Sequence, residues 1–335
     1  MLPNTAVIGA GLAGLTFANR FVAHGGSVSV FDKGRGPGGR TSQRRVDVDH
    51  DGDVSLRRFH HGAQYFTASS NAFAQALEIW QERGLVAPYI GKVARIRNGE
   101  VVDAPERRRY VGTPGMNEPA KYLATNIDVR TRRKLIKLER RAGEKSDRWY
   151  LHFENGRCVG GFDLVVFTSP PVQTVELLED HPIAAPVVEK LGEVHLRPQW
   201  AGMFAYAGEP DVPFDAAMVE THPIAGWLMA TPGRRDAWTL LASHEWSEAN
   251  LERDKADVAN DLAAAAKDLL GLNPIYKAAH RWRYSRCDKP LGEPFVFDEA
   301  AGLAACGDWC LGDKAEHAHL SGRALADHVD GQPAL

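Results

Sequence analysis

The chain opens with a short apolar run, a glycine-rich stretch and a segment whose apolar residues recur at helical spacing. Residues 5–8 (TAVI) are apolar and partly β-branched, which is typical of a buried strand. Residues 15–22 place apolar side chains on one helical face, and residues 27–31 (SVSVF) read as a second strand. This order of elements predicts a Rossmann-type βαβ unit.

The hydrophobic pattern of the remaining chain alternates between helical and strand spacing. It predicts a helix over 71–83, a hairpin over 93–102, strands at 127–130, 134–140, 149–153 and 162–169, strands at 197–206 and 238–244, a long amphipathic helix over 248–270, a last sheet strand at 280–284, a strand at 303–306 and a helix over 318–329. Residues 43–58 are rich in Asp and Arg, and we expect them to form an exposed excursion.

Composition narrows the classes of protein. The 335 residues are 44% hydrophobic and 25% charged, which is ordinary for a globular protein of two domains. The net charge of −3 lacks the positive excess that is typical of nucleic-acid-binding proteins. The four cysteines are scattered along the sequence, which is typical of proteins in a reducing compartment. No run approaches the ~20 apolar residues of a membrane span. We therefore expect a cytoplasmic protein without membrane or nucleic-acid partners, and the adjacent histidines at 60 and 61 lack the further ligands of a metal site.

The glycine-rich stretch between the first strand and helix has the spacing G-x-G-x-x-G. Its first glycine permits a tight turn, its second lets the backbone approach a pyrophosphate, and its third allows close packing of helix and strand. Asp32 follows the second strand 23 residues after Gly9, near the ~20-residue interval at which a carboxylate meets a ribose hydroxyl. The candidate dinucleotide-binding residues here are Gly9, Gly11, Leu12, Ala13, Gly14 and Asp32.

A second glycine-rich loop follows the acid and ends in a basic residue. It contains Lys33, Gly38, Gly39 and Arg40, whose guanidinium can bind phosphate oxygens in a bidentate manner. An acid followed by a Gly-Gly-Arg loop resembles the flavin amine oxidase superfamily. That resemblance implies FAD, held non-covalently, and no redox-active C-x-x-C pair is present.

The run of residues 62–66 (GAQYF) after this loop looks like the renalase branch of that superfamily, as do the runs at 242–247 and 280–284. The resemblance implies that backbone and side chains at Ala63 and Gln64 meet the flavin, and that Val129 meets the adenine. A Gly-Asp pair after the last strand and the start of the following helix complete the implied cofactor set, which comprises Gly307, Asp308, His317 and Ala318.

Two residues depart from the renalase pattern. His244 stands where that pattern suggests proline, and His317 stands where it suggests glycine. Two expectations are open for His317. Its protonated imidazole would favour the anionic reduced flavin, or its side chain would turn outward to solvent. The candidates for the substrate pocket are Tyr65, His244 and Trp282.

The resemblance implies an α/β fold with a Rossmann-type, glutathione-reductase-2-like FAD domain and an inserted mixed-sheet substrate domain. We expect residues 1–68, 112–170 and 286–335 in the FAD domain, and 69–111 and 171–285 in the substrate domain.

The implied activity is oxidation of the 2- and 6-dihydro isomers of NAD(P) by hydride transfer to FAD, with O2 reduced to hydrogen peroxide. An amine oxidase or desaturase on the same scaffold stays open, as does a non-catalytic flavin-fold binding protein. The run Arg107-Arg108-Arg109 fits either a solvated face or a site that attracts a phosphorylated substrate.

Overall fold

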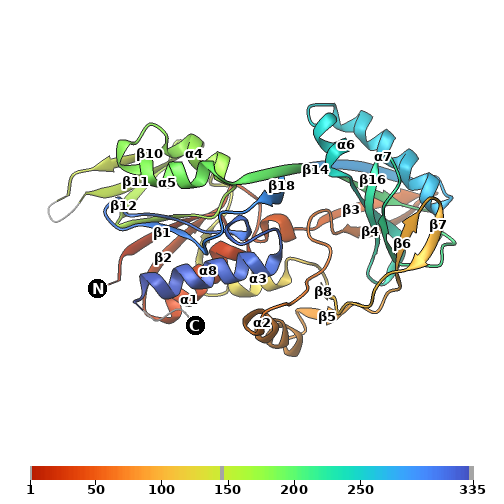
Figure 1. The fold of residues 1–335 in the computed structure, drawn as a ribbon, viewed down its shortest axis with the longest axis horizontal. Helices are drawn as coiled ribbons and strands as arrows, with labels where there is room; N and C mark the ends of the chain where they lie inside the picture. The colour runs from red at the N-terminus through yellow and green to blue at the C-terminus, as the bar shows by residue number, and fades with distance from the viewer. Residues whose placement is uncertain (1, 144–146, 332–335) are drawn as a thin grey trace.

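The computed structural model describes residues 2–143 and 147–331, which form two lobes side by side (Figure 1). The first lobe is built on a six-stranded sheet. Its strands, in spatial order, are β19 (Val296–Asp298), β20 (Leu303–Ala305), β13 (Leu164–Phe167), β1 (Asn4–Ile8), β2 (Ser27–Phe31) and β9 (Asp128–Arg130). All neighbours are parallel except β19 and β20. The predicted Rossmann-type fold is confirmed, with β1 beside β2 and β13 at its centre.

Side chains alternate across β1 and thereby supply two separate cores. Val7 faces one core, in which the helices α1 (Leu12–Ala23), α2 (Asn71–Glu82), α3 (Glu118–Leu123) and α8 (Ala315–Val329) cover the sheet. Ala6 and Ile8 face the other, which is closed by α4 (Pro171–Leu178), α5 (Ala185–Gly192) and the antiparallel sheet of β10 (Leu135–Arg141), β11 (Arg148–Phe153) and β12 (Cys158–Phe162). Burial of strand residues on both faces explains their nearly continuous apolar sequence.

The second lobe contains a seven-stranded mixed sheet. Its order is β18 (Tyr276–Lys289), β14 (His195–Ala205), β17 (Arg234–Ala242), β16 (Ala225–Thr231), β15 (Ala216–Val219), β6 (Val93–Arg97) and β7 (Glu100–Asp103). The helix α7 (Lys255–Leu270) packs Val258 and Leu262 on one face of this sheet. Here too the fold prediction of a mixed-sheet lobe is confirmed.

Strands β14 and β18 belong to both lobes. They pair antiparallel from His195 opposite Lys289 to Ala205 opposite Tyr276. At one end Cys287 is buried in the core that closes on α4 and α5, and at the other Phe204 is buried beneath α7. The two strands therefore run from one lobe into the other, as Figure 1 shows.

The charged segment expected to be an excursion is instead a hairpin of β3 (Arg44–His50) and β4 (Asp53–Phe59). Val48 and Phe59 pack against Met203 and Ala237 on the face of the large sheet opposite α7. The expectation was wrong because the charged residues, which suggested a loop, occupy the outer face of the hairpin. Asp51-Gly52, with φ of 54° and 85°, is a typical hairpin turn and was the signal for two paired strands.

The predicted helix over 248–270 is two helices, α6 (His244–Ala249) and α7. The Asp254 carboxylate accepts the Ala256 backbone N–H at 2.7 Å and begins α7 as a new helix. A short two-stranded sheet of β5 (Val86–Pro88) and β8 (Tyr110–Gly112) completes the strands. Within the described ranges, no helix combines the length and the apolar character needed to cross a bilayer.

The exact domain boundaries stay a prediction. Three segments, however, pack against the other lobe from the one to which the prediction assigned them. The β3–β4 hairpin lies on the large sheet of the second lobe. The helix α2 packs with α1 and α8, and the helices α4 and α5 share a core with the six-stranded sheet. Each of these segments packs its apolar face against a sheet surface that would otherwise be exposed, and the order of the elements along the chain does not reveal which surface that is.

Helix α8 approaches α1 so closely that only glycine fits at their crossing. A Cβ at Gly322 would lie 2.2 Å from the carbonyl oxygen of Ala13. Arg20 of α1 also pairs with Asp327 of α8, whose side chain is buried. The close crossing fixes the N-termini of these two helices relative to each other.

Gly322→Ala should therefore destabilise the protein, by about 1–3 kcal/mol of unfolding free energy for an overpacked site. Gly192→Ala is the matched control, because a Cβ at this residue of α5 meets nothing within 4 Å. The control should be neutral or slightly stabilising, since alanine favours the helix. Urea unfolding of both variants tests this, and equal stabilities would contradict the close crossing.

Candidate functional site

A large cleft of about 2020 Å3 runs from the carboxyl ends of the parallel strands to the second lobe. It is the position at which open α/β sheets bind ligands. Of the residues predicted from sequence, those that line it are Gly9, Gly11, Leu12, Ala13, Asp32, Lys33, Gly38, Gly39, Arg40, Ala63, Gln64, Tyr65, His244, Trp282, Gly307, Asp308 and Ala318. Gly14, Val129 and His317 are not among the residues that line it.

The turn after β1 has the geometry that its glycines predict. Gly9 has a φ of 119°, which side chains rarely adopt, and its N–H donates to the Phe31 carbonyl at 2.8 Å. A Cβ at Gly11 would project into open space, with nothing within 4 Å. The unpaired N–H groups that begin α1 therefore face a cavity that an anion can enter. Gly14 has a structural role, because a Cβ there would lie 2.2 Å from the Gly9 carbonyl oxygen.

Asp32 stands at the end of β2 with both carboxylate oxygens engaged by the backbone. Oδ2 accepts the Ala10 N–H and Oδ1 accepts the Gly34 N–H, each at 2.6 Å. A carboxylate oxygen can accept more than one hydrogen bond, so these contacts orient Asp32 and leave acceptor sites on the cleft side.

Val129 packs against the core of α1 and α2, away from the cleft. The segment that does line the cleft beside Asp32 is Lys134–Leu135–Ile136, brought there because the Arg133 N–H donates to the Asp32 carbonyl at 2.8 Å. Ile136 is 52% exposed and presents an apolar side chain to the cleft. Sequence reasoning missed this wall because the strand's alternation does not reveal which side faces a ligand.

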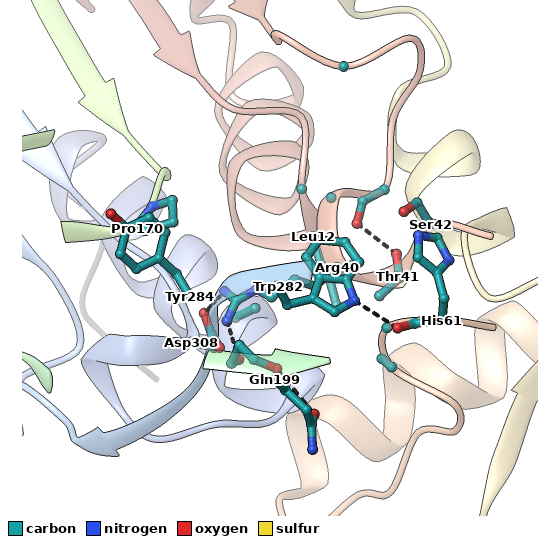
Figure 2. A pocket seen from close by; sticks show the side chains of 18 of the residues that line it. Leu12, Arg40, Thr41, Ser42, His61, Pro170, Gln199, Trp282, Tyr284 and Asp308 are labelled. Carbon is teal, nitrogen blue, oxygen red and sulfur yellow. Dashed lines mark hydrogen bonds and ion pairs between the residues drawn. The ribbon is translucent and has the colours of Figure 1, made fainter. Parts of the chain in front are cut away.

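Arg40 connects three parts of the cleft wall (Figure 2). Its Nη1 donates to the Ser285 carbonyl of β18 at 3.0 Å, and its Nη2 pairs with the carboxylate of Asp308. Its own carbonyl accepts the Ala63 N–H at 2.8 Å. The guanidinium expected to bind phosphate is thus already held in place by a buried carboxylate.

The stretch from Ala63 to Phe66 forms the next part of the wall. The side chain of Gln64 accepts the indole N–H of Trp227 at 2.6 Å, which joins this stretch to β16. The Tyr65 ring lies 5.6 Å from Trp227, and the Arg109 guanidinium lies over it at 5.3 Å. One member of the arginine run therefore contacts a predicted pocket residue.

Three ring side chains form a compact group beside this stretch, since a Cβ at Gly62 would lie 3.3 Å from the Trp282 ring. The centroids of His61 and Trp282 are 5.3 Å apart and stacked, and His280 lies 4.4 Å from Trp282 and 4.7 Å from His61. The indole N–H of Trp282 donates to the His61 carbonyl at 2.7 Å (Figure 2). We call this group the aromatic wall, and all three members line the cleft.

Both histidines of the aromatic wall are held neutral. Burial, together with the nearby His280, lowers the pKa of His61 to about 3. Burial also lowers the pKa of His280 to about 4, assisted by the positive charges of Lys255 and Arg44. Sequence reasoning missed both residues as pocket candidates, although their place in the GAQYF and HRWRY regions was a signal.

His244 and His317 make local contacts. The Nδ1 of His244 lies 2.9 Å from the Pro198 carbonyl, so that nitrogen carries the proton. The Nδ1 of His317 accepts the Lys314 N–H at 3.3 Å at the start of α8. The expected effect of His317 on a flavin stays a prediction, and its side chain lies beside Gly312.

The neighbouring residue Glu316 anchors the start of α8. Its carboxylate is 1% exposed and accepts hydrogen bonds from the N–H and hydroxyl groups of Ser69 and Ser70. Burial alone raises the pKa of Glu316, but the hydrogen bonds from Ser70 and Ser69 outweigh it and leave the pKa below its ordinary value. The helix N-terminus at Ala315 and Ala318 is thereby fixed in the cleft wall.

The cleft is strongly positive although the chain has a net charge of −3. Fifteen of its lining residues are Lys or Arg and five are Asp or Glu. A cleft with one sign of charge concentrates ligands of the opposite sign. Among the described residues, no group of three His, Cys, Asp or Glu side chains is arranged to hold a metal ion.

Residues 7–82 match the family model described as an NAD(P)-binding Rossmann-like domain. Solved structures resemble the whole chain. A candidate protoporphyrinogen oxidase from Exiguobacterium sp. 255-15 has a TM-score of 0.70 at 12% identity, with 97% of this chain and 98% of that chain covered. A putrescine oxidase variant from a redesign of cofactor binding has a TM-score of 0.68 at 14% identity, with 98% of each chain covered.

These likenesses show the fold of the amine oxidase and protoporphyrinogen oxidase type. The chain has a Rossmann-like dinucleotide-binding domain and a mixed-sheet lobe arranged as in those oxidases.

Because His61 and His280 have lowered pKa values, neither imidazole should titrate between pH 5.5 and 8. NMR of the ring nitrogens tests this directly. A midpoint near ~6.5, the ordinary value for histidine, would contradict the neutral aromatic wall.

The same burial should make the protein less stable in acid. The unfolded chain binds protons near pH ~6.5, whereas buried His60, with its pKa lowered to about 4, does not. The unfolding free energy should fall as the pH drops from ~6.5, the pKa of histidine in the unfolded chain, by up to about 1.4 kcal/mol per pH unit for each such histidine. His60→Gln should have a shallower dependence, measured by urea unfolding at several pH values between 5 and 7.5.

Proposed function

We propose that this chain binds FAD non-covalently and oxidises 2- and 6-dihydro isomers of NAD(P), with O2 as the final acceptor. The observation that carries the proposal is the continuous cleft, which joins the dinucleotide turn to a positively charged pocket with a neutral aromatic wall. Such a pocket suits a planar substrate that carries phosphates.

The residues present fit FAD at each part of the cleft. The open space at Gly11 accommodates a pyrophosphate at the start of α1, and Asp32 is placed for a ribose hydroxyl. The exposed Ile136 offers an apolar surface to an adenine. In this proposal Arg40, Ala63 and Gln64, with Gly307, Asp308 and Ala318, hold the remainder of the cofactor.

When bound, FAD supplies the acceptor for a hydride. The chain's own contribution is to position the substrate and to favour negative charge. The start of α8, fixed by Glu316, presents its positive dipole end to the cleft. The aromatic wall offers uncharged ring faces for a nicotinamide. A dihydronicotinamide already carries a transferable hydride, so positioning suffices and no acid–base pair is needed.

The positive cleft disfavours the alternative of an amine oxidase. A protonated amine would enter a site with three times as many basic as acidic side chains. The retained dinucleotide turn and the ordered cleft wall likewise support an enzyme over a non-catalytic binding protein.

The purified protein should be yellow and should release intact FAD on denaturation. Asp32→Ala should weaken FAD binding by about 1–3 kcal/mol, as expected for a lost hydrogen bond to a charged group. Asp128→Ala, on the neighbouring strand and outside the cleft, is the control and should bind FAD normally. A colourless protein that cannot be reconstituted would refute FAD binding.

Anaerobic stopped-flow mixing tests the substrate class. The 2- and 6-dihydro isomers should bleach the flavin absorbance much faster than putrescine or benzylamine. Rapid bleaching by an amine, with none by the isomers, would move the assignment to amine oxidation.

A further inference from the structure

Two basic side chains on the second-lobe side of the cleft lack acidic partners. Arg44 begins β3 and Lys255 begins α7, and both are exposed and line the cleft. In the part of the chain that the structure describes, neither lies within 4.0 Å of a carboxylate. Their neighbours differ, since Arg283 binds Glu252 at 2.5 Å and Arg197 binds Glu248 at 2.7 Å. The positive charges of Arg283 and Arg197 are thus offset by carboxylates, whereas those of Arg44 and Lys255 are not.

Both unpaired cations stand close to the aromatic wall. Arg44 pairs across the β3–β4 ladder with Phe59, two residues before His61. Glu252, three residues before Lys255, binds Arg281 and Arg283, the residues on either side of Trp282. The two cations come from different elements on either side of β18, the strand that carries His280 and Trp282. A ligand ring against the wall would therefore have two positive side chains within reach of its substituents.

We propose that Arg44 and Lys255 form an oxyanion subsite that holds the phosphate of the pyridine nucleotide substrate beside the aromatic wall. This inference rests on the proposed function and adds the residues that select its substrate. An exposed pair of like charges repels itself, and the pyrophosphate of a dinucleotide, with two negative charges in total, relieves that repulsion better than a single carboxylate. A pyrophosphate also has four non-bridging oxygens with which to accept hydrogen bonds from both side chains.

Binding to the oxidised holoenzyme tests the subsite without turnover. Nicotinamide mononucleotide and nicotinamide riboside differ only in the phosphate, and each is titrated while the flavin absorbance is followed. We expect the mononucleotide to bind more tightly. Arg44→Gln and Lys255→Gln should each weaken its binding about tenfold and leave the riboside within about twofold.

Arg283→Gln is the matched control, because it removes an equal charge from the same cleft at a side chain already paired with Glu252. It should change the affinity for the mononucleotide by less than about twofold, since a paired surface charge contributes little. Far-ultraviolet circular dichroism and flavin content confirm that each variant is folded and loaded.

Three results would overturn the subsite. The mononucleotide and the riboside could bind equally well, or all three variants could weaken the mononucleotide equally, which would indicate only the general field of the cleft. The third is that the Arg44 and Lys255 variants weaken binding of glutarate, a short dicarboxylate, but not of the mononucleotide. The proposed function fails separately, if the dihydro isomers do not reduce the flavin while the mononucleotide still depends on both cations.

Discussion

The contacts of Arg40 join three parts of the cleft wall that lie far apart in the sequence. Ser285 lies 245 positions and Asp308 268 positions further along the chain, and Arg40 contacts both. Asp308 is 5% exposed, and a carboxylate buried to that degree is stable only when it is paired. The arginine therefore brings the second glycine loop, β18 and the C-terminal loop into one wall, and the cleft has its shape because this pair is satisfied.

The parts of the fold that could be predicted from sequence are those whose burial is uniform. Strands β1, β2 and β13 lie between two cores and are rich in apolar and β-branched residues, so their pattern located each of them to within two residues. The β3–β4 hairpin has one buried and one charged face, and because of its charged residues the sequence pattern did not indicate strands. The break between α6 and α7 depends on a single capping carboxylate, Asp254, in a sequence that otherwise continues a helical pattern.

The site divides in the same way. Backbone-determined features, such as the turn at Gly9 and the acid at the end of β2, were predicted because glycine and aspartate have positional meaning in a Rossmann unit. The cleft wall at Ile136, the pairing of Arg40 and the neutral state of His61 were not. Each depends on which distant segment packs alongside, and a local pattern carries no information on partners more than 100 residues away.

The sharing of β14 and β18 between the lobes has a consequence for cooperativity. Their ladder of backbone hydrogen bonds enters both hydrophobic cores, so one lobe cannot separate from the other without exposing Cys287, Phe204 and the strands between them. Amide protons along these strands are then exchanged with solvent only when the whole molecule opens. We therefore expect the two lobes to unfold as one unit, although each has its own core.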